Sequence, residues 1–177
     1  MKPEESARTL GATIQLIRLF QSVLEKNVRK PRIWSLKRID ARQRHRVLLS
    51  AALAAFDHAC FALNRDEGRS CVMDALFVIL IRTGNRKNDE ISDEDVRRFE
   101  ETYSEIGSAL SGKEFVAPRD GSPFESGAHG LFKKCSDMLG APGDDLAFMK
   151  FYPGASHTYL GIAQFLSNYW PTILEAS

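Results

Sequence analysis

The residues best suited to chemistry in this chain are basic side chains gathered in one short segment. Residues 26–46 hold nine Lys or Arg residues against a single acidic one, although the formal net charge of the chain is only +1. Arg38, Arg42 and Arg46 recur every four residues, so they would line one edge of a helix. Dense basic side chains bind phosphates, and an exposed aromatic such as Trp34 stacks on bases or guanidinium planes. The candidate binding residues are Lys30, Arg32, Trp34, Lys37, Arg38, Arg42 and Arg46.

Two other interpretations of this basic segment remain open. Its charges could solvate a junction between helices while Ile33, Trp34 and Leu36 pack into the core. The segment could also pair inside the protein with residues 89–105, where eight acidic residues outweigh two arginines. That acidic stretch is itself either a solubilising surface or a face that attracts a basic partner. Its candidate contact residues are Asp93, Glu94, Glu101 and Glu105.

A histidine at the end of the basic segment supplies a possible catalytic pair. Arg38 and His45 are separated by six residues. This spacing resembles the motif of HEPN-type ribonucleases, helical bundles in which four to six residues separate an Arg from the His that follows it. The resemblance covers eight residues and implies that Arg38 would steady a phosphate while His45 serves acid–base cleavage, without a metal ion. Nucleic-acid binding or cleavage is therefore one hypothesis for function.

The histidines and cysteines of the chain form no metal-binding or cofactor-binding motif. The four histidines form neither an H-x-x-x-H pair nor an HExxH motif, so we expect no metal and no cofactor. His58 falls on the apolar side of a predicted helix, where a core histidine hydrogen-bonded to a neighbour is expected. Cys60, Cys71 and Cys135 are odd in number and widely spaced, which predicts reduced core thiols and favours a cytoplasmic location.

Helical periodicity dominates the chain, and the alternation typical of strands is nearly absent. Asp40 and Ser92 are predicted N-caps, and Pro153-Gly154 and Pro171 are predicted to interrupt or end the last helices. The predicted helices cover about residues 5–27, 41–63, 69–83, 93–110, 131–139, 145–152 and 156–169.

These elements predict an all-α protein with one domain, residues 1–177. We expect six to seven helices around a central apolar helix at about 69–83, because CVMDALFVILI is apolar on nearly all sides. Residues 111–130 are rich in glycine and proline and are predicted to form a loop. No stretch approaches the roughly 20 apolar residues of a membrane span, so no membrane association is expected. The absence of alternating strands and of a glycine-rich turn between a strand and a helix argues against Rossmann and P-loop folds.

The split charges, together with the missing catalytic motifs, favour a cytoplasmic, non-enzymatic interaction protein. An adaptor, an inhibitor or an immunity-type binder would use charged helical surfaces to select a protein partner. The alternative is a metal-independent nuclease or nucleic-acid binder that uses residues 26–46. The sequence does not indicate an oligomeric state.

Overall fold

The computed structural model describes residues 3–28, 40–84, 92–141 and 143–176 of the chain. None of the described residues lies in a strand, and the predicted all-α, single-domain bundle is confirmed. The described residues form six α-helices and two short 3-10 helices: α1 (Pro3–Asn27), α2 (Ala41–Ala62), α3 (Arg69–Gly84), α4 (Asp93–Gly107), η1 (Ser108–Leu110), η2 (Pro123–Glu125), α5 (Gly127–Met138) and α6 (Asp145–Ala176).

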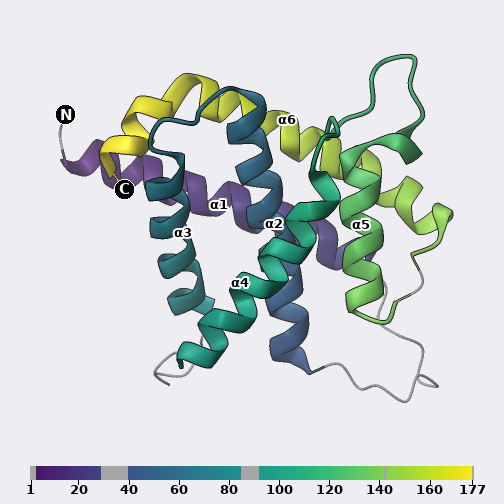
Figure 1. Ribbon diagram of the computed structural model, residues 1–177. Coiled ribbons are helices and arrows are strands. Elements are labelled where there is room, and N and C mark those ends of the chain that lie inside the picture. The colour runs from purple at the N-terminus through teal and green to yellow at the C-terminus, as the bar shows by residue number, and fades with distance from the viewer. Residues whose placement is uncertain (1–2, 29–39, 85–91, 142, 177) are drawn as a thin grey trace.

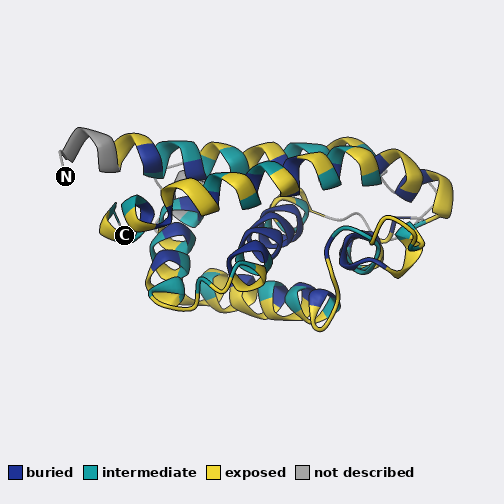
Figure 2. Ribbon diagram, turned by 90° about the horizontal axis from the view of Figure 1, so that it is seen from above, coloured by how far each residue is buried: buried dark blue, intermediate teal, exposed yellow. Residues whose placement is uncertain are grey.

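The helices are arranged in layers around α2. The two longest helices, α1 and α6, lie side by side and run in opposite directions (Figure 1). Seen from above, α2 lies between this pair and α4, with α3 and α5 on either side (Figure 2). Because α2 is enclosed from several directions, its register decides how the neighbouring helices meet.

The central helix is α2, so the prediction that residues 69–83 form the centre was wrong. Every residue from Val47 to Phe56 is buried, and Figure 2 shows α2 in dark blue over most of its length. Many of these positions are alanines, whose small side chains let neighbouring helices approach α2 closely from different sides. Small size, more than strong hydrophobicity, therefore marks the most enclosed helix.

The apolar helix α3 lies at the side of the bundle instead. Its buried stripe is Val72, Leu76 and Leu80, a spacing of four residues that corresponds to one face of a helix. Asp74, which a central position would have buried, is exposed, and the exposed fraction of Val78 is 44%. Some of the apolar side chains of α3 therefore remain in contact with water.

Local capping signals set the helix starts as predicted. Asp40 accepts a hydrogen bond from the backbone N–H of Arg42 (3.3 Å) at the start of α2. Ser92 accepts one from the backbone N–H of Asp95 (3.2 Å) at the start of α4. Asp144 does the same for the N–H of Ala147 (2.7 Å) before α6. Each side chain satisfies a backbone donor that has no partner within its own helix.

The sequence predicted that Pro153-Gly154 and Pro171 would interrupt or end the C-terminal helices. This prediction was wrong, because α6 is one continuous helix from Asp145 to Ala176. Pro153 and Pro171 both lie inside this helix. A proline within a helix removes a backbone donor and crowds the preceding turn. Here the cost is offset by burial on both sides of Pro153, with Phe148 and Phe151 before it and Ala155, Ile162 and Leu166 after it.

The predicted loop at residues 111–130 is shorter than expected. α5 begins at Gly127 with Ser126 as its N-cap, so the last four residues belong to a helix. The backbone N–H of Gly127 donates to the carbonyl of Glu114 (2.7 Å). A Cβ added at Gly130 would lie 2.7 Å from the Ala109 carbonyl oxygen. These glycines serve close packing of α5 against η1 and the residues that follow it.

Candidate functional site

Most of the predicted basic site lies outside the described residues. This applies to Lys30, Arg32, Trp34, Lys37 and Arg38. The described part comprises Lys26 near the end of α1 and the arginines at the start of α2, where Arg42 is exposed and Arg46 is half-buried.

Arg44, in the same segment, serves the fold. Its Nη2 donates to the carbonyl oxygens of Glu25 (3.3 Å) and Val28 (3.2 Å) at the C-terminal end of α1. The last carbonyls of a helix have no partner within it, and a cationic donor also suits the negative end of the helix dipole. One charge of the basic segment therefore joins the end of α1 to the start of α2.

His45, the proposed catalytic histidine, is exposed and packs beside α1. Its Nδ1 accepts a hydrogen bond from Nε2 of Gln21 (3.3 Å). Partial burial against α1 lowers the pKa of His45, the nearby charge of Arg18 lowers it further, and Glu25 opposes both. The imidazole is therefore predominantly neutral near pH 7. Since Arg38 lies outside the described residues, the Arg38–His45 pair remains a prediction.

The predicted acidic face lies on the outer side of α4. Asp93, Glu94, Glu101 and Glu105 are all exposed, and the buried side of the helix carries Phe99, Thr102 and Ile106. α4 holds six acidic residues and two arginines. We call the outward carboxylates of residues 93–105 the acidic face of α4.

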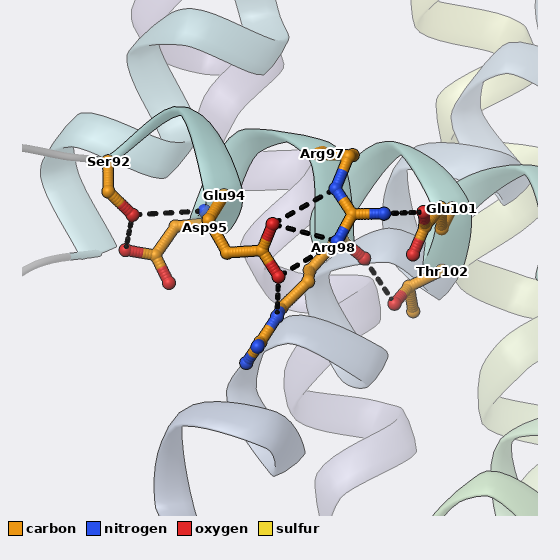
Figure 3. Close-up of polar contacts among 7 residues, drawn as sticks. All are labelled: Ser92, Glu94, Asp95, Arg97, Arg98, Glu101 and Thr102. Carbon is orange, nitrogen blue, oxygen red and sulfur yellow. Dashed lines mark hydrogen bonds and ion pairs between the residues drawn. The ribbon is translucent and has the colours of Figure 1, made fainter.

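Ion pairs on this face form largely within α4 itself (Figure 3). Glu94 lies 2.7 Å from Arg97 and 2.6 Å from Arg98, and Arg97 also lies 2.7 Å from Glu101. Hydrogen bonds from Arg97 and Arg98 lower the pKa of Glu94, so its carboxylate stays charged. These exposed pairs order the side chains along the helix and add little stability.

The basic and acidic surfaces do not pair with each other in the described part of the chain. Glu105 meets Lys134 of α5 at 2.7 Å, and the other ion pairs of α4 use its own arginines. Arg42, Arg44 and Arg46, the described arginines of the basic segment, form no ion pair or hydrogen bond with α4. Asp93 and Glu100 are exposed and take part in none of these ion pairs, so the face keeps a negative balance.

Beside the acidic face lies a cavity of about 630 Å³, between the C-terminal halves of α2 and α4. This volume is in the range of ligand-binding pockets. Its lining residues come from α2, the start of α3, the end of α4, η1 and the loop after η1: Ala54, Asp57, His58, Phe61, Ala62, Arg69, Tyr103, Ser104, Gly107, Leu110, Ser111, Gly112, Lys113 and Glu114.

A half-buried ion pair lies at the wall of this cavity. Nε of Arg69 lies 3.3 Å from Oδ1 of Asp57, and its Nη1 lies 3.5 Å from Asp66. The guanidinium also lies over the ring of Phe61, 5.6 Å from its centroid. Burial raises the pKa of Tyr103, and the Asp57 carboxylate, which accepts a hydrogen bond from the tyrosine hydroxyl, adds to the rise. Asp57 thus has two partners.

The hydrogen-bonded state predicted for His58 is confirmed, but the side chain is half-buried in the wall of the cavity and not in the core. Its Nε2 lies 2.9 Å from the carbonyl oxygen of Lys113, which can only accept, so Nε2 carries the proton. Nδ1 then accepts from the hydroxyl of Tyr159 (2.7 Å). Both ring nitrogens are used within the protein, which leaves the imidazole no free nitrogen for proton transfer in the cavity.

The cysteines supply no activated nucleophile near the cavity. Burial, with a contribution from Asp57, raises the pKa of the Cys60 thiol to about 12, and burial raises that of Cys135 likewise. All three cysteines are free; the expected burial of Cys71 was wrong, because this residue is exposed on α3. A thiol with such a raised pKa is a poor nucleophile near neutral pH.

Sequence reasoning missed the cavity and misjudged one residue in it. Polar residues at steps of four and seven along this helix (Arg42, Arg46, Ser50, Asp57 and Asn64) predict a solvated stripe that includes Asp57, but the Asp57 side chain is 25% exposed and paired with Arg69. The available signal was the spacing of Ala54, Asp57, His58 and Phe61, which places all four on one face of α2. The register between α2 and α4, which creates the open space, has no local sequence signal.

No protein-family model, curated protein or solved structure matches this chain. Within the described ranges, every helix is too short or too polar to cross a bilayer. The described His, Cys, Asp and Glu side chains form no group of three that could hold a metal ion.

Proposed function

We propose that this chain is a cytoplasmic, non-enzymatic interaction protein that binds a basic protein partner through the acidic face of α4. The observation that carries the proposal is the orientation of this face. Its carboxylates point to water, and the arginines that pair with them belong to the same helix. A negative surface of this kind raises the association rate with a positive partner and disfavours negative ones.

The chemistry of the cavity supports binding over catalysis. In the cavity wall, His58 uses both ring nitrogens inside the protein and Asp57 is paired with Arg69; Cys60, on the same helix, is fully buried and its thiol is held protonated. General acid–base or nucleophilic catalysis needs such groups to be available to a substrate. The free thiols agree with the reducing cytoplasm, where disulfides are rare.

The proposal is tested by charge reversal with a matched control. Asp93→Lys/Glu100→Lys changes two exposed carboxylates of α4, and Asp120→Lys/Glu175→Lys makes the same net charge change in the loop and near the end of α6. Proteins retained from a lysate by the immobilised wild type are identified, and the affinity of the purified pair is then measured.

We expect the α4 variant to weaken binding at low salt by about tenfold or more, mainly through a slower association rate, while the control variant stays close to wild type. Equal affinities for the two variants would contradict the proposal. So would a purified protein that retains RNA tightly, because that result would favour the nucleic-acid alternative.

A further inference from the structure

The open surface of the cavity is chiefly apolar, and two of the polar side chains in its wall are committed to partners within the protein. Asp57 is bound to Arg69, and His58 to the Tyr159 hydroxyl and the Lys113 carbonyl. Beside polar side chains such as Ser104 and Lys113, the apolar surface offered to an occupant comes mainly from the exposed Phe61 and Ala62, because Ala54 and Leu110 are buried. Water in such a space finds few hydrogen-bond partners, so an apolar group that replaces it gains free energy.

An aromatic group suits this cavity particularly well. Phe61 lines the cavity, and its exposed fraction is 61%. Arg69 lies 5.6 Å from the centroid of this ring. An incoming aromatic ring could pack against both groups, and such ring pairs stabilise beyond their buried area. Aromatic side chains are also the residues that most often anchor protein interfaces in pockets.

The charge next to the cavity indicates what carries this aromatic group. Ser104 and Gly107 of α4 line the cavity, and Glu100 lies one turn before Ser104 on the same edge of the helix. Asp93 follows on that edge farther toward the N-terminus. With a rise of about 1.5 Å per residue, these carboxylates lie about 6 Å and about 16 Å along α4 from Ser104. A partner seated at the cavity would meet negative charge at both distances.

We infer that the cavity receives an aromatic side chain of a basic, helical partner segment that lies along α4. Lys or Arg residues of this segment, about four and eleven residues from the aromatic one, face Glu100 and Asp93. The inference rests on the proposed function and deepens it, because it names the chemistry of the partner: an aromatic anchor flanked by positive charge.

Gly107 provides a way to close the cavity without disturbing the fold. A Cβ added there would meet no heavy atom within 4 Å, and the backbone is helical (φ −59°, ψ −34°). Gly107→Phe therefore places a ring at the cavity. Gly161→Phe is the matched control, because Gly161 lies in α6 and a Cβ there also meets open space. Dispersed amide NMR spectra check that both variants are folded.

The probe is a synthetic helical peptide of about 15 residues with one Trp and with Lys four and eleven residues from it. Companion peptides replace the Trp by Ser or both Lys by Glu, and neutral N-acetyl-tryptophanamide tests the ring alone. Amide shifts of Ser111 and Gly112 report on the cavity, and those of residues 93–101 report on the acidic face.

We expect the Trp–Lys peptide to shift both sets of amides, and each companion peptide to bind at least tenfold more weakly. Gly107→Phe should abolish the shifts at the cavity, and Gly161→Phe should not. Shifts at the acidic face alone, equal for the Trp and Ser peptides, would overturn the inference and leave the proposed function standing. No shift at the acidic face with any Lys peptide would count against both. Equal binding of N-acetyl-tryptophanamide would overturn the basic partner in favour of a small aromatic ligand.

Discussion

The start of α2 and the outer side of α4 carry opposite charges and use them differently. At α2, Arg44 extends to the end of α1 and donates to two backbone carbonyls. On α4, Glu94 and Glu101 meet the arginines of their own helix and remain at the surface. The comparison shows that charge density along a sequence does not distinguish a charge that serves the fold from one available to a partner. What decides is whether a backbone group without a partner lies within reach.

The largest expected effect on the free energy of unfolding comes from removing the side chain of Arg44. Arg44→Ala leaves the Glu25 and Val28 carbonyls without these donors, and we expect the free energy of unfolding to fall by about 1.5 kcal/mol. Arg42→Ala, at an exposed position of the same helix, should change it by less than about 0.5 kcal/mol. Urea unfolding measures both. Equal effects would show that Arg44, too, is a surface charge.

Features encoded by neighbouring residues could be predicted from the sequence. Asp40 and Ser92 act as caps within their own turns, so their roles follow from local spacing. The continuity of α6 through Pro153 could not be predicted, because the stabilising burial comes from distant helices. The cavity depends on the register between α2 and α4, which is also a tertiary property. The exposed carboxylates of α4 were predicted because helical periodicity alone places Phe99 and Ile106 on the opposite side.

A smaller effect is expected at the end of α4, where Gly107 has helical dihedral angles. Gly107→Ala should raise the free energy of unfolding by about 0.5–1 kcal/mol, because alanine restricts the unfolded chain and meets open space in the folded one. Gly112→Ala is the matched comparison, since its φ of +69° disfavours any side chain. That variant should lose stability by about 1 kcal/mol. Thermal unfolding of the two variants should therefore give shifts of opposite sign.

The smallest effect concerns His45 at the start of α2. Its folded pKa lies below the ordinary value of 6.5, so the unfolded chain binds the proton more readily. The contribution of His45 to stability is therefore complete above about pH 6.5 and declines as the pH falls toward the folded pKa. An NMR titration should give an imidazole midpoint below 6.5, and His45→Gln should lose less stability than wild type between pH 7.5 and 5.5. A midpoint above 6.5 would show that Glu25 outweighs burial and Arg18.

The most direct test of the central claim compares the two charged regions against one partner. The affinity of the captured protein is measured at increasing salt for the wild type, for Asp93→Lys/Glu100→Lys on α4 and for Lys26→Glu/Arg42→Glu at the basic end. We predict that affinity falls with salt, that the α4 variant loses about tenfold or more at low salt, and that the basic-end variant binds as wild type does. The purified protein should retain neither RNA nor DNA at about 150 mM salt. Loss of partner binding confined to the basic-end variant, or tight salt-sensitive nucleic-acid binding, would contradict the account.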